Sequence, residues 1–189
     1  MQEWMADVAY KFRIAFIDGD RWKLYLQGLG VTIQIAVFAA ILGVVIGTVI
    51  ALMKMSTTRT GKRTIFSYLA QAYIDIIRGT PSVLQLLIMW FIVMSSSKNG
   101  VLVAVLTFGI NSGAYVSEIM RAGIQAVDHG QMEAGRSLGL SKAQTMRYII
   151  LPQAIKNVLP PIGNEFIVLF LYNSKLKFFF GFWCFKFFL

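Results

Sequence analysis

Cysteine is nearly absent from this chain of 189 residues, and the one cysteine, Cys184, excludes an internal disulfide. Histidine is equally scarce: His129, which we expect in a loop, is the one histidine, so no set of cysteines and histidines has metal-ligand spacing. The phosphate-binding pattern Gly-x-x-x-x-Gly-Lys-Ser/Thr does not occur either. We therefore expect no disulfide, no metal site built from cysteine and histidine, and no nucleotide held by a phosphate-binding loop of this chain.

Charged residues are also few. They make up 14% of the chain, whereas 57% of the residues are hydrophobic and the mean hydropathy is +0.64. Such a composition is too apolar for an ordinary soluble domain and predicts an integral membrane protein. The net charge of +9 does not indicate nucleic-acid binding, because the basic residues lie mostly between hydrophobic runs and form no stripe interleaved with exposed aromatics.

Four hydrophobic runs cover most of the chain. The first, residues 24–53, holds no charged residue and is long enough for one tilted transmembrane helix. The second, residues 64–94, is too long for one straight span, and Gly79-Thr80-Pro81 should break or kink it. The third begins at Val101, and the fourth is residues 148–172. The sequence thus predicts an all-α, polytopic membrane helix bundle with about four spans.

Small residues recur every four positions in the first run, at Ala39, Gly43, Gly47 and Ala51. They form a stripe on one helical face, against which another helix can approach closely. We favour packing within the bundle over a dedicated dimer interface.

Charged and polar residues interrupt the later runs. Asp75 and Arg78 lie three positions apart, near enough to pair on a helix. A charged pair in a span is a functional candidate, and a structural pair at the membrane interface is an equal alternative. Pro160 and Pro161 remove two amide donors and should kink the fourth run. Polar side chains of the third and fourth runs could line a solute pathway or make helix contacts, and we expect both; the candidates for the pathway are Asn111, Ser112, Tyr115, Glu118, Asn164 and Glu165.

A polar segment, residues 128–152, separates the third and fourth runs. Asp128 and Gln131 have the spacing of a capping box that starts a helix, and Gly139 suits the left-handed position that ends one. Ser141 and Gln144 repeat the capping box and should start the next helix. The first of these helices is too short to span a bilayer, so we interpret it as a contact surface for a partner.

The same segment resembles the cytoplasmic signature of the permease subunits of bacterial ATP-binding-cassette importers. That signature reads Glu-Ala-Ala, three residues, Gly, nine residues, Ile, any residue, Leu, Pro. The matching residues here are Glu133, Ala134, Gly135, Gly139, Ile149, Leu151 and Pro152. Gly135 departs from the preferred alanine, which lowers helix propensity by up to about 1 kcal/mol.

Other motifs resemble the branch of this family that carries polar amino acids, namely the histidine, glutamine, glutamate and arginine permeases. They are Arg78-Gly79-Thr80-Pro81 with Gln85-Leu86, Asn111-Ser112-Gly113-Ala114-Tyr115 with Glu118 and Arg121, and Pro160-Pro161 with Gly163-Asn164-Glu165. The resemblance covers roughly Gly28 to Leu169.

The resemblance implies the permease subunit of a type I importer that moves polar amino acids across the bacterial inner (cytoplasmic) membrane by alternating access. The chain itself would not be an enzyme and would bind no cofactor, because ATP and Mg would bind to separate ATPase subunits. An extracytoplasmic binding protein would deliver the amino acid, and a second permease subunit, identical or related, would complete the pathway. Contact with the ATPase would fall to Glu133, Ala134, Gly135, Ser137, Leu138 and Gly139. The alternatives are a passive channel, an ion-coupled secondary transporter that uses Asp75, Glu118 or Glu165, and an inactive fragment.

We expect three regions along the chain. Residues 1–23 form an interfacial segment with aromatic residues such as Trp4 and Trp22. Residues 24–172 form the transmembrane core, with a coupling loop at 121–147. Residues 173–189, rich in lysine and phenylalanine, depart from the family pattern and are expected to stand in place of a missing fifth span, as after a frameshift or early stop.

Basic residues predict the orientation. The loops 54–63 and 121–147 each contain four Lys or Arg residues and are expected to be cytoplasmic, whereas the N-terminus and residues 95–100 are expected outside. The tail's three lysines would equalise the two sides, but they are left out because the tail departs from the family pattern, and the comparison is then eight basic residues against five.

Overall fold

The computed structural model describes residues 1–56 and 64–187, with the side chains of 2, 15, 16, 21 and 173–187 left out of the description. Within this part every regular element is helical, which confirms the all-α prediction. The α-helices are α1 (Gln2–Phe12), α2 (Arg21–Met55), α3 (Ile65–Gly79), α4 (Ser82–Ile88), α5 (Gly100–Gln125), α6 (His129–Ser137), α7 (Lys142–Thr145) and α8 (Leu151–Phe187). Arg13–Ile17, Met89–Val93 and Met146–Ile150 are π-helical, and Asp18–Asp20 is a 3₁₀ turn.

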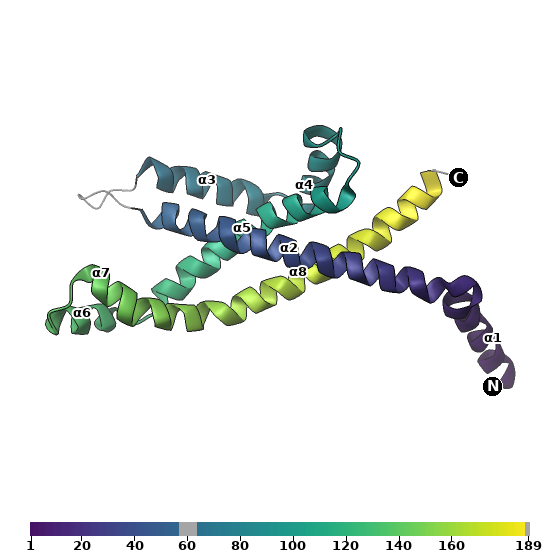
Figure 1. Ribbon diagram of the computed structural model, residues 1–189, viewed down its shortest axis with the longest axis horizontal. Coiled ribbons are helices and arrows are strands. Elements are labelled where there is room, and N and C mark those ends of the chain that lie inside the picture. Colours follow the sequence, from purple (N-terminus) through teal and green to yellow (C-terminus); the bar gives the residue numbers. More distant parts are fainter. Residues whose placement is uncertain (57–63, 188–189) are drawn as a thin grey trace.

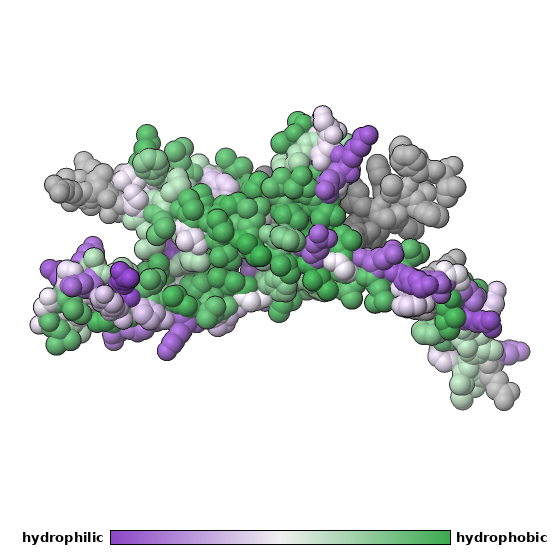
Figure 2. Space-filling view, viewed as in Figure 1, coloured by the Kyte–Doolittle hydropathy of each residue, from purple (hydrophilic) through white to green (hydrophobic). Residues whose placement is uncertain are grey.

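Three helical stretches are long and apolar enough to cross a membrane: Asp18–Met55, Gly100–Gln125 and Lys142–Tyr172. A fourth is the pair Ile65–Gly79 and Ser82–Val93, bent by 102° at the break between them. The prediction of about four spans is confirmed. Hydrophobic residues cover the middle of the molecule, and polar residues gather at its two ends (Figure 2).

Helices α2 and α5 make the closest helix contact, through the predicted stripe of small residues. Ala39 and Ala51 are buried, and a Cβ at Gly43 would lie 2.8 Å from Ser112 Cβ. The contact is reciprocal, since a Cβ at Gly109 on α5 would lie 2.5 Å from Leu42 Cδ2. The stripe therefore packs within the bundle, as we expected.

A hydrophobic core joins α2, α4, α5 and α8. Ile35 and Ala39 of α2 meet the fully buried Phe108 of α5, and Leu86 and Leu169 contribute from α4 and α8. Burial of these side chains holds the bent α3–α4 pair and the fourth span against the α2–α5 pair.

The break between α3 and α4 falls at Gly79-Thr80-Pro81, as predicted. Gln85 stabilises it: its Nε2 donates to the Ile77 carbonyl at 2.7 Å and to Thr80 Oγ1 at 2.7 Å. The Thr80 hydroxyl in turn donates to the Ile76 carbonyl at 3.0 Å. Polar side chains thus satisfy carbonyls that the break leaves without helical partners.

Helix α8 is not interrupted at Pro160 and Pro161, where the kink that we expected stays a prediction. Helix α8 continues from Leu151 through both prolines, and beyond residue 172, as far as Phe187 (Figure 1). Packing of buried Ala154, Val158 and Leu169 against neighbouring helices holds this stretch helical on both sides of the prolines. Tertiary contact here outweighs the local preference of proline.

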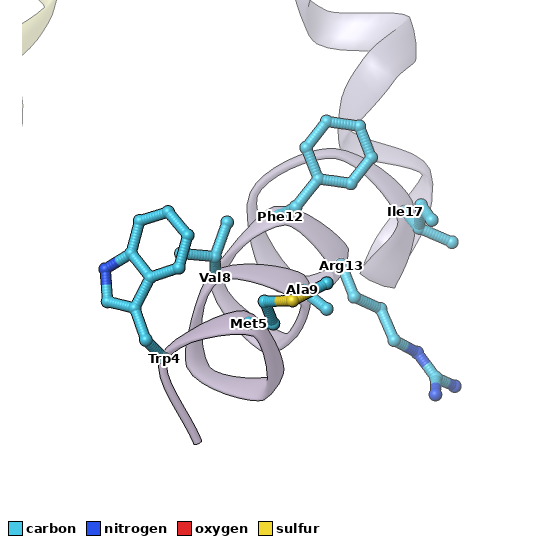
Figure 3. A pocket seen from close by; sticks show the side chains of 7 residues that line it. All are labelled: Trp4, Met5, Val8, Ala9, Phe12, Arg13 and Ile17. Atoms are coloured by element: carbon cyan, nitrogen blue, oxygen red, sulfur yellow. The ribbon is translucent and has the colours of Figure 1, made fainter. Parts of the chain in front are cut away.

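The N-terminal segment turns away from α2 at Gly19 and Asp20, whose φ angles of 70° and 57° are both left-handed. Its apolar side chains are exposed, with Trp4 at 69%, and they line an open hollow together with Arg13 (Figure 3). An apolar face beside a basic residue suits the membrane interface. Its placement there stays a prediction.

Candidate functional site

Helix α6 begins at Asp128, as predicted, but by a simpler cap. The Asp128 carboxylate accepts a hydrogen bond from the Gly130 amide at 2.6 Å, whereas the Gln131 side chain faces Gln153 of α8 at 3.4 Å. The predicted bond between the Gln131 side chain and the Asp128 amide is therefore wrong, because the Gln131 side chain turns to α8. The second capping box is confirmed: Ser141 accepts from the Gln144 amide, and the Gln144 side chain accepts from the Ser141 amide.

Gly139 ends α6 in the left-handed conformation, with φ at 81°. Its amide donates to the Arg136 carbonyl at 3.0 Å, and the Leu140 amide donates to the Gly135 carbonyl at 3.1 Å. These two bonds form a Schellman motif, which satisfies the last carbonyls of the helix. The prediction for Gly139 is confirmed.

The structure explains why residue 135 is glycine, where the family signature prefers alanine. Gly135 is the buried residue of α6, and a Cβ there would lie 2.4 Å from Thr145 Cγ2. The glycine lets α6 lie directly on the start of the following helix. Beneath it, Val127, Ile150 and Ala154 form a small apolar cluster.

The remaining residues predicted to touch a partner lie on the surface. We call these exposed residues the coupling face: Glu133, Ala134, Ser137, Leu138 and Gly139. Leu138 is 80% exposed, and this large apolar side chain stands at the very end of the helix. Gly135 does not belong to the face, because it is covered by Thr145.

Polar residues on α5 face the broken α3–α4 pair. Asn111 Nδ2 donates to Gln85 Oε1 at 3.0 Å, and one turn later the Tyr115 ring lies under the Arg78 guanidinium, 5.1 Å from its carbon to the ring centroid. Asp75 accepts from Gln71 Nε2 at 2.7 Å. The predicted pair between Asp75 and Arg78 is therefore not formed, because each side chain has a different neighbour.

Glu118, the next candidate along α5, forms a cluster with two cations. One carboxylate oxygen contacts Lys54 Nζ at the end of α2, and the other accepts from Arg121 Nη2 at 2.8 Å. Arg121 also donates to Gln125 Oε1 at 2.7 Å. We call Lys54, Glu118 and Arg121 the charge cluster. The cluster joins α2 to α5 close to the end of α5, since Arg121 lies four residues before Gln125, the last residue of that helix.

Ser112 and Glu165 lie together on the other side of α5, toward α8. The Ser112 hydroxyl is buried, and the half-buried Glu165 carboxyl lies close enough to interact with it. Asn164 is exposed on α8. The six pathway candidates thus divide into a face with Asn111, Tyr115 and Glu118, and a separate group toward α8.

Two residues that contact the candidate site, Gln85 and Lys54, have no functional role in the sequence analysis. Gln85 stood in a motif without an assigned role, although it contacts both the break and Asn111. Lys54 was counted only as a loop charge, although it contacts Glu118. A signal was available for Lys54, since a lone basic residue directly after an uncharged span often pairs with a buried acid on a neighbouring helix.

We expect Glu118→Ala to lower the stability of the fold by about 2 kcal/mol, because it leaves Lys54 and Arg121 without their common partner. Thermal unfolding in detergent measures the effect. Glu3→Ala, at an exposed N-terminal acid, is the control and should change little. An unchanged unfolding temperature for Glu118→Ala would show that the charge cluster contributes nothing to stability.

Three straight spans and one bent span are packed together, and a short exposed helix lies at one end of the bundle. This is the architecture of the transmembrane permease of type I ATP-binding-cassette importers. A crystal structure of an amino acid ABC transporter with histidines superposes with a TM-score of 0.75 and 41% identity, over 93% of this chain and 75% of that chain. An inward-facing structure of the MetNI methionine ABC transporter shares the fold, with a TM-score of 0.70 and 20% identity over 84% of this chain and 75% of that chain.

The family model described as the binding-protein-dependent transport system inner membrane component matches residues 43–182, and the chain belongs to this family. The match continues past Leu169, where we expected the resemblance to stop. The arginine transport system permease protein ArtQ of Bacillus subtilis is 44% identical over 76% of this chain and 65% of its own length. The glutamine transport system permease protein GlnP of Escherichia coli is 37% identical over 77% of this chain and 66% of its own length. The chain thus spans about two thirds of these relatives.

Proposed function

We propose that this chain is the permease subunit of an ATP-driven importer that carries polar amino acids across the bacterial inner (cytoplasmic) membrane. The observation that carries the proposal is the coupling face: a short helix, closed by Gly139 and exposed at Leu138, at the signature spacing. Burial of the exposed Leu138 side chain against a partner protein would remove apolar surface from water, which favours docking. The partner would be an ATPase subunit, which would hold the ATP and Mg.

Movement of α6 would reach the spans through two short connections. Toward α5, the chain passes through Gln125, which Arg121 binds beside the charge cluster. Toward α8, α6 rests on Thr145, and the chain continues without a loop from α7 through Met146–Ile150 into α8. A shift of α6 on the ATPase would therefore displace α5 and α8 together, which is what alternating access requires.

The polar residues of α5 would line the pathway on two sides. Asn111 and Tyr115 would contribute from the face toward α3 and α4, and Ser112 would contribute from the side toward α8, together with Asn164 and Glu165. A second permease subunit would enclose the pathway, and an extracytoplasmic binding protein would deliver the amino acid. The names of the relatives, which refer to arginine and glutamine, support a polar amino acid as the substrate.

Secondary transport driven by a proton at Glu118 is the weaker proposal. Both oxygens of its carboxylate contact cations, Lys54 and Arg121, so protonation would remove two favourable ion pairs. A carboxylate that exchanges protons during transport needs a less strongly stabilised anionic form.

The test of the proposed function is uptake into proteoliposomes that contain the chain with its ATPase and binding protein. We expect accumulation of radiolabelled L-arginine or L-glutamine with ATP inside the vesicles and none with a non-hydrolysable analogue. Accumulation that follows an imposed pH gradient without ATP would contradict the proposal and favour secondary transport.

Orientation is testable with single cysteines in a Cys184→Ser background. The ends of α2 and α3, at Met55 and Ile65, lie at the same end of the molecule as α6 and α7, and the turn before α5 lies away from them (Figure 1). We expect a membrane-impermeant thiol reagent added to intact cells to label Ser97→Cys and to spare Ser137→Cys. The reverse pattern would show the opposite orientation. Arg59, in the first basic loop, lies outside the described residues.

A further inference from the structure

Apolar side chains cover one side of helix α1 and of the π-helical turn that follows it. Trp4, Val8 and Phe12 lie four residues apart, which places them in one row along the helix. Figure 3 shows these side chains around an open hollow. The exposed fractions are 69% for Trp4 and 57% for Phe12. We call the row and its apolar neighbours the N-terminal face: Trp4, Met5, Val8, Ala9, Phe12 and Ile17.

The first span indicates where the N-terminal face lies relative to the membrane. The uncharged run of this span begins at Leu24, and Trp22 and Lys23 stand directly before it. Lys23 Nζ lies over the Trp22 ring, 5.7 Å from its centroid. Tryptophan and lysine at the end of a span mark the boundary between hydrocarbon and headgroups. Gly19 and Asp20, just before this boundary, turn the chain away from the axis of α2, so α1 extends sideways from it (Figure 1).

The charges around the N-terminal face are balanced. Residues 1–23 contain four acidic and four basic side chains, whereas the rest of the chain contains five acidic and fourteen basic ones. Lys11 Nζ lies 2.6 Å from Asp7 Oδ2, and Arg13 Nε lies 3.4 Å from Asp18 Oδ1. Helices that bind anionic lipids carry an excess of Lys and Arg. Because this segment lacks the excess, burial of apolar surface has to supply its affinity for a membrane.

The exposed apolar surface continues from α1 into the span. Leu24, Leu26 and Leu29 at the start of α2 are exposed as well, so no helix of the described chain covers this end of the span. Once α2 crosses a membrane, the leaflet that surrounds these leucines is also the nearest apolar medium for the N-terminal face. Lipid is therefore the occupant that the position of the face favours.

We propose that α1 lies flat in the extracytoplasmic leaflet, with the N-terminal face among the acyl chains, and that this attachment does not depend on anionic lipid. Trp4, Val8 and Phe12 would enter the leaflet, whereas Glu3 and Asp7, on the other side of the helix, would stay in water. The attachment is independent of the transport function. It would hold the start of α2 at a fixed depth in the membrane.

Nitroxide labels on the full chain in phosphatidylcholine nanodiscs measure the depth of each side of α1. The labels are attached to Val8→Cys, in the N-terminal face, and to Ala6→Cys, on the opposite side, each in a Cys184→Ser background. We expect the label at residue 8 to be at least about tenfold less accessible to a water-soluble nickel reagent than the label at residue 6, and more accessible to oxygen. Replacing part of the phosphatidylcholine by the anionic phosphatidylglycerol, or raising the salt concentration, should leave both values unchanged.

Two matched substitutions separate insertion of the face from general effects of charge. Phe12→Glu places a carboxylate within the N-terminal face and should raise the nickel accessibility at residue 8 to the value at residue 6. Tyr10→Glu adds the same charge to the opposite side of α1 and should leave the depth of the label as in the wild type. Both substitutions lie before the first span, so both variants should reach the membrane.

Three results would overturn the proposal. Equal nickel accessibility of the two labels would show that lipid does not cover the N-terminal face. Burial of the label at residue 8 that requires phosphatidylglycerol would show that anionic headgroups supply the attachment. Dipolar broadening between labels at residue 8, together with low accessibility to both nickel and oxygen, would show that a second copy of the chain covers the face.

Discussion

Gly139→Asp is expected to leave the chain in the membrane and to reduce ATP-driven uptake at least about tenfold. The left-handed φ of 81° accepts aspartate and asparagine better than other side chains, and no atom lies within 4 Å of the position that a Cβ would take. The substitution adds backbone strain, as any side chain does at positive φ, but we expect the fold to survive it. The carboxylate, however, would stand at the end of the coupling face and would lose its water when the partner docks, which weakens association.

Gly139→Asn is the matched control, because it has the same shape and the same backbone preference without the charge. We expect it to keep most of the uptake. Uptake and ATP hydrolysis are measured together in proteoliposomes, beside the amount of permease in the membrane. Wild-type uptake by Gly139→Asp would show that Gly139 lies away from the docking contact, and an equal loss in both variants would assign the effect to backbone strain.

Gly47→Leu is expected to prevent stable folding. A Cβ at this position would lie 2.7 Å from both Cβ and Cγ1 of Val116 and 3.0 Å from the Gly113 carbonyl oxygen. These atoms belong to the backbone and to a stiff β-branched side chain, so α2 and α5 would have to separate. Overpacking of this kind costs about 3 kcal/mol, a large part of the stability of a typical domain.

The same helix offers a control for this substitution. Gly30→Leu adds the same side chain to α2 at a position where no atom lies within 4 Å of the added Cβ. We expect wild-type abundance in the membrane and a wild-type unfolding temperature for Gly30→Leu, and a strong loss of both for Gly47→Leu. Equal behaviour of the two variants would show that the α2–α5 contact is not as close as described.

Local signals in the sequence predicted the local structure well. The turn at Gly139 and the capping box of Ser141 and Gln144 depend on residues a few positions apart, and both are confirmed. The stripe at Gly43 and Gly47 could be predicted from helical periodicity alone. Its partner on α5 was not identified, because one helix does not specify which neighbour it meets.

Contacts between distant segments were not predicted. Arg78 contacts Tyr115 instead of Asp75, and Glu118 binds Lys54, which lies 64 positions away. Such pairs depend on how the spans are packed, and sequence spacing alone does not reveal it. At Pro160 packing against the neighbouring helices keeps α8 continuous, although proline disfavours a helix interior.

The close contact between Gly43 and Ser112 restricts how this chain can change over evolutionary time. Ser112 is buried, and its Cβ lies 2.8 Å from the position that a Cβ at residue 43 would occupy. Any gain of volume at one of these positions must therefore be matched by a loss at the other. Among relatives that keep this helix crossing, residues 43 and 112 should covary in size, with a small pair preserved even where the surrounding spans have diverged.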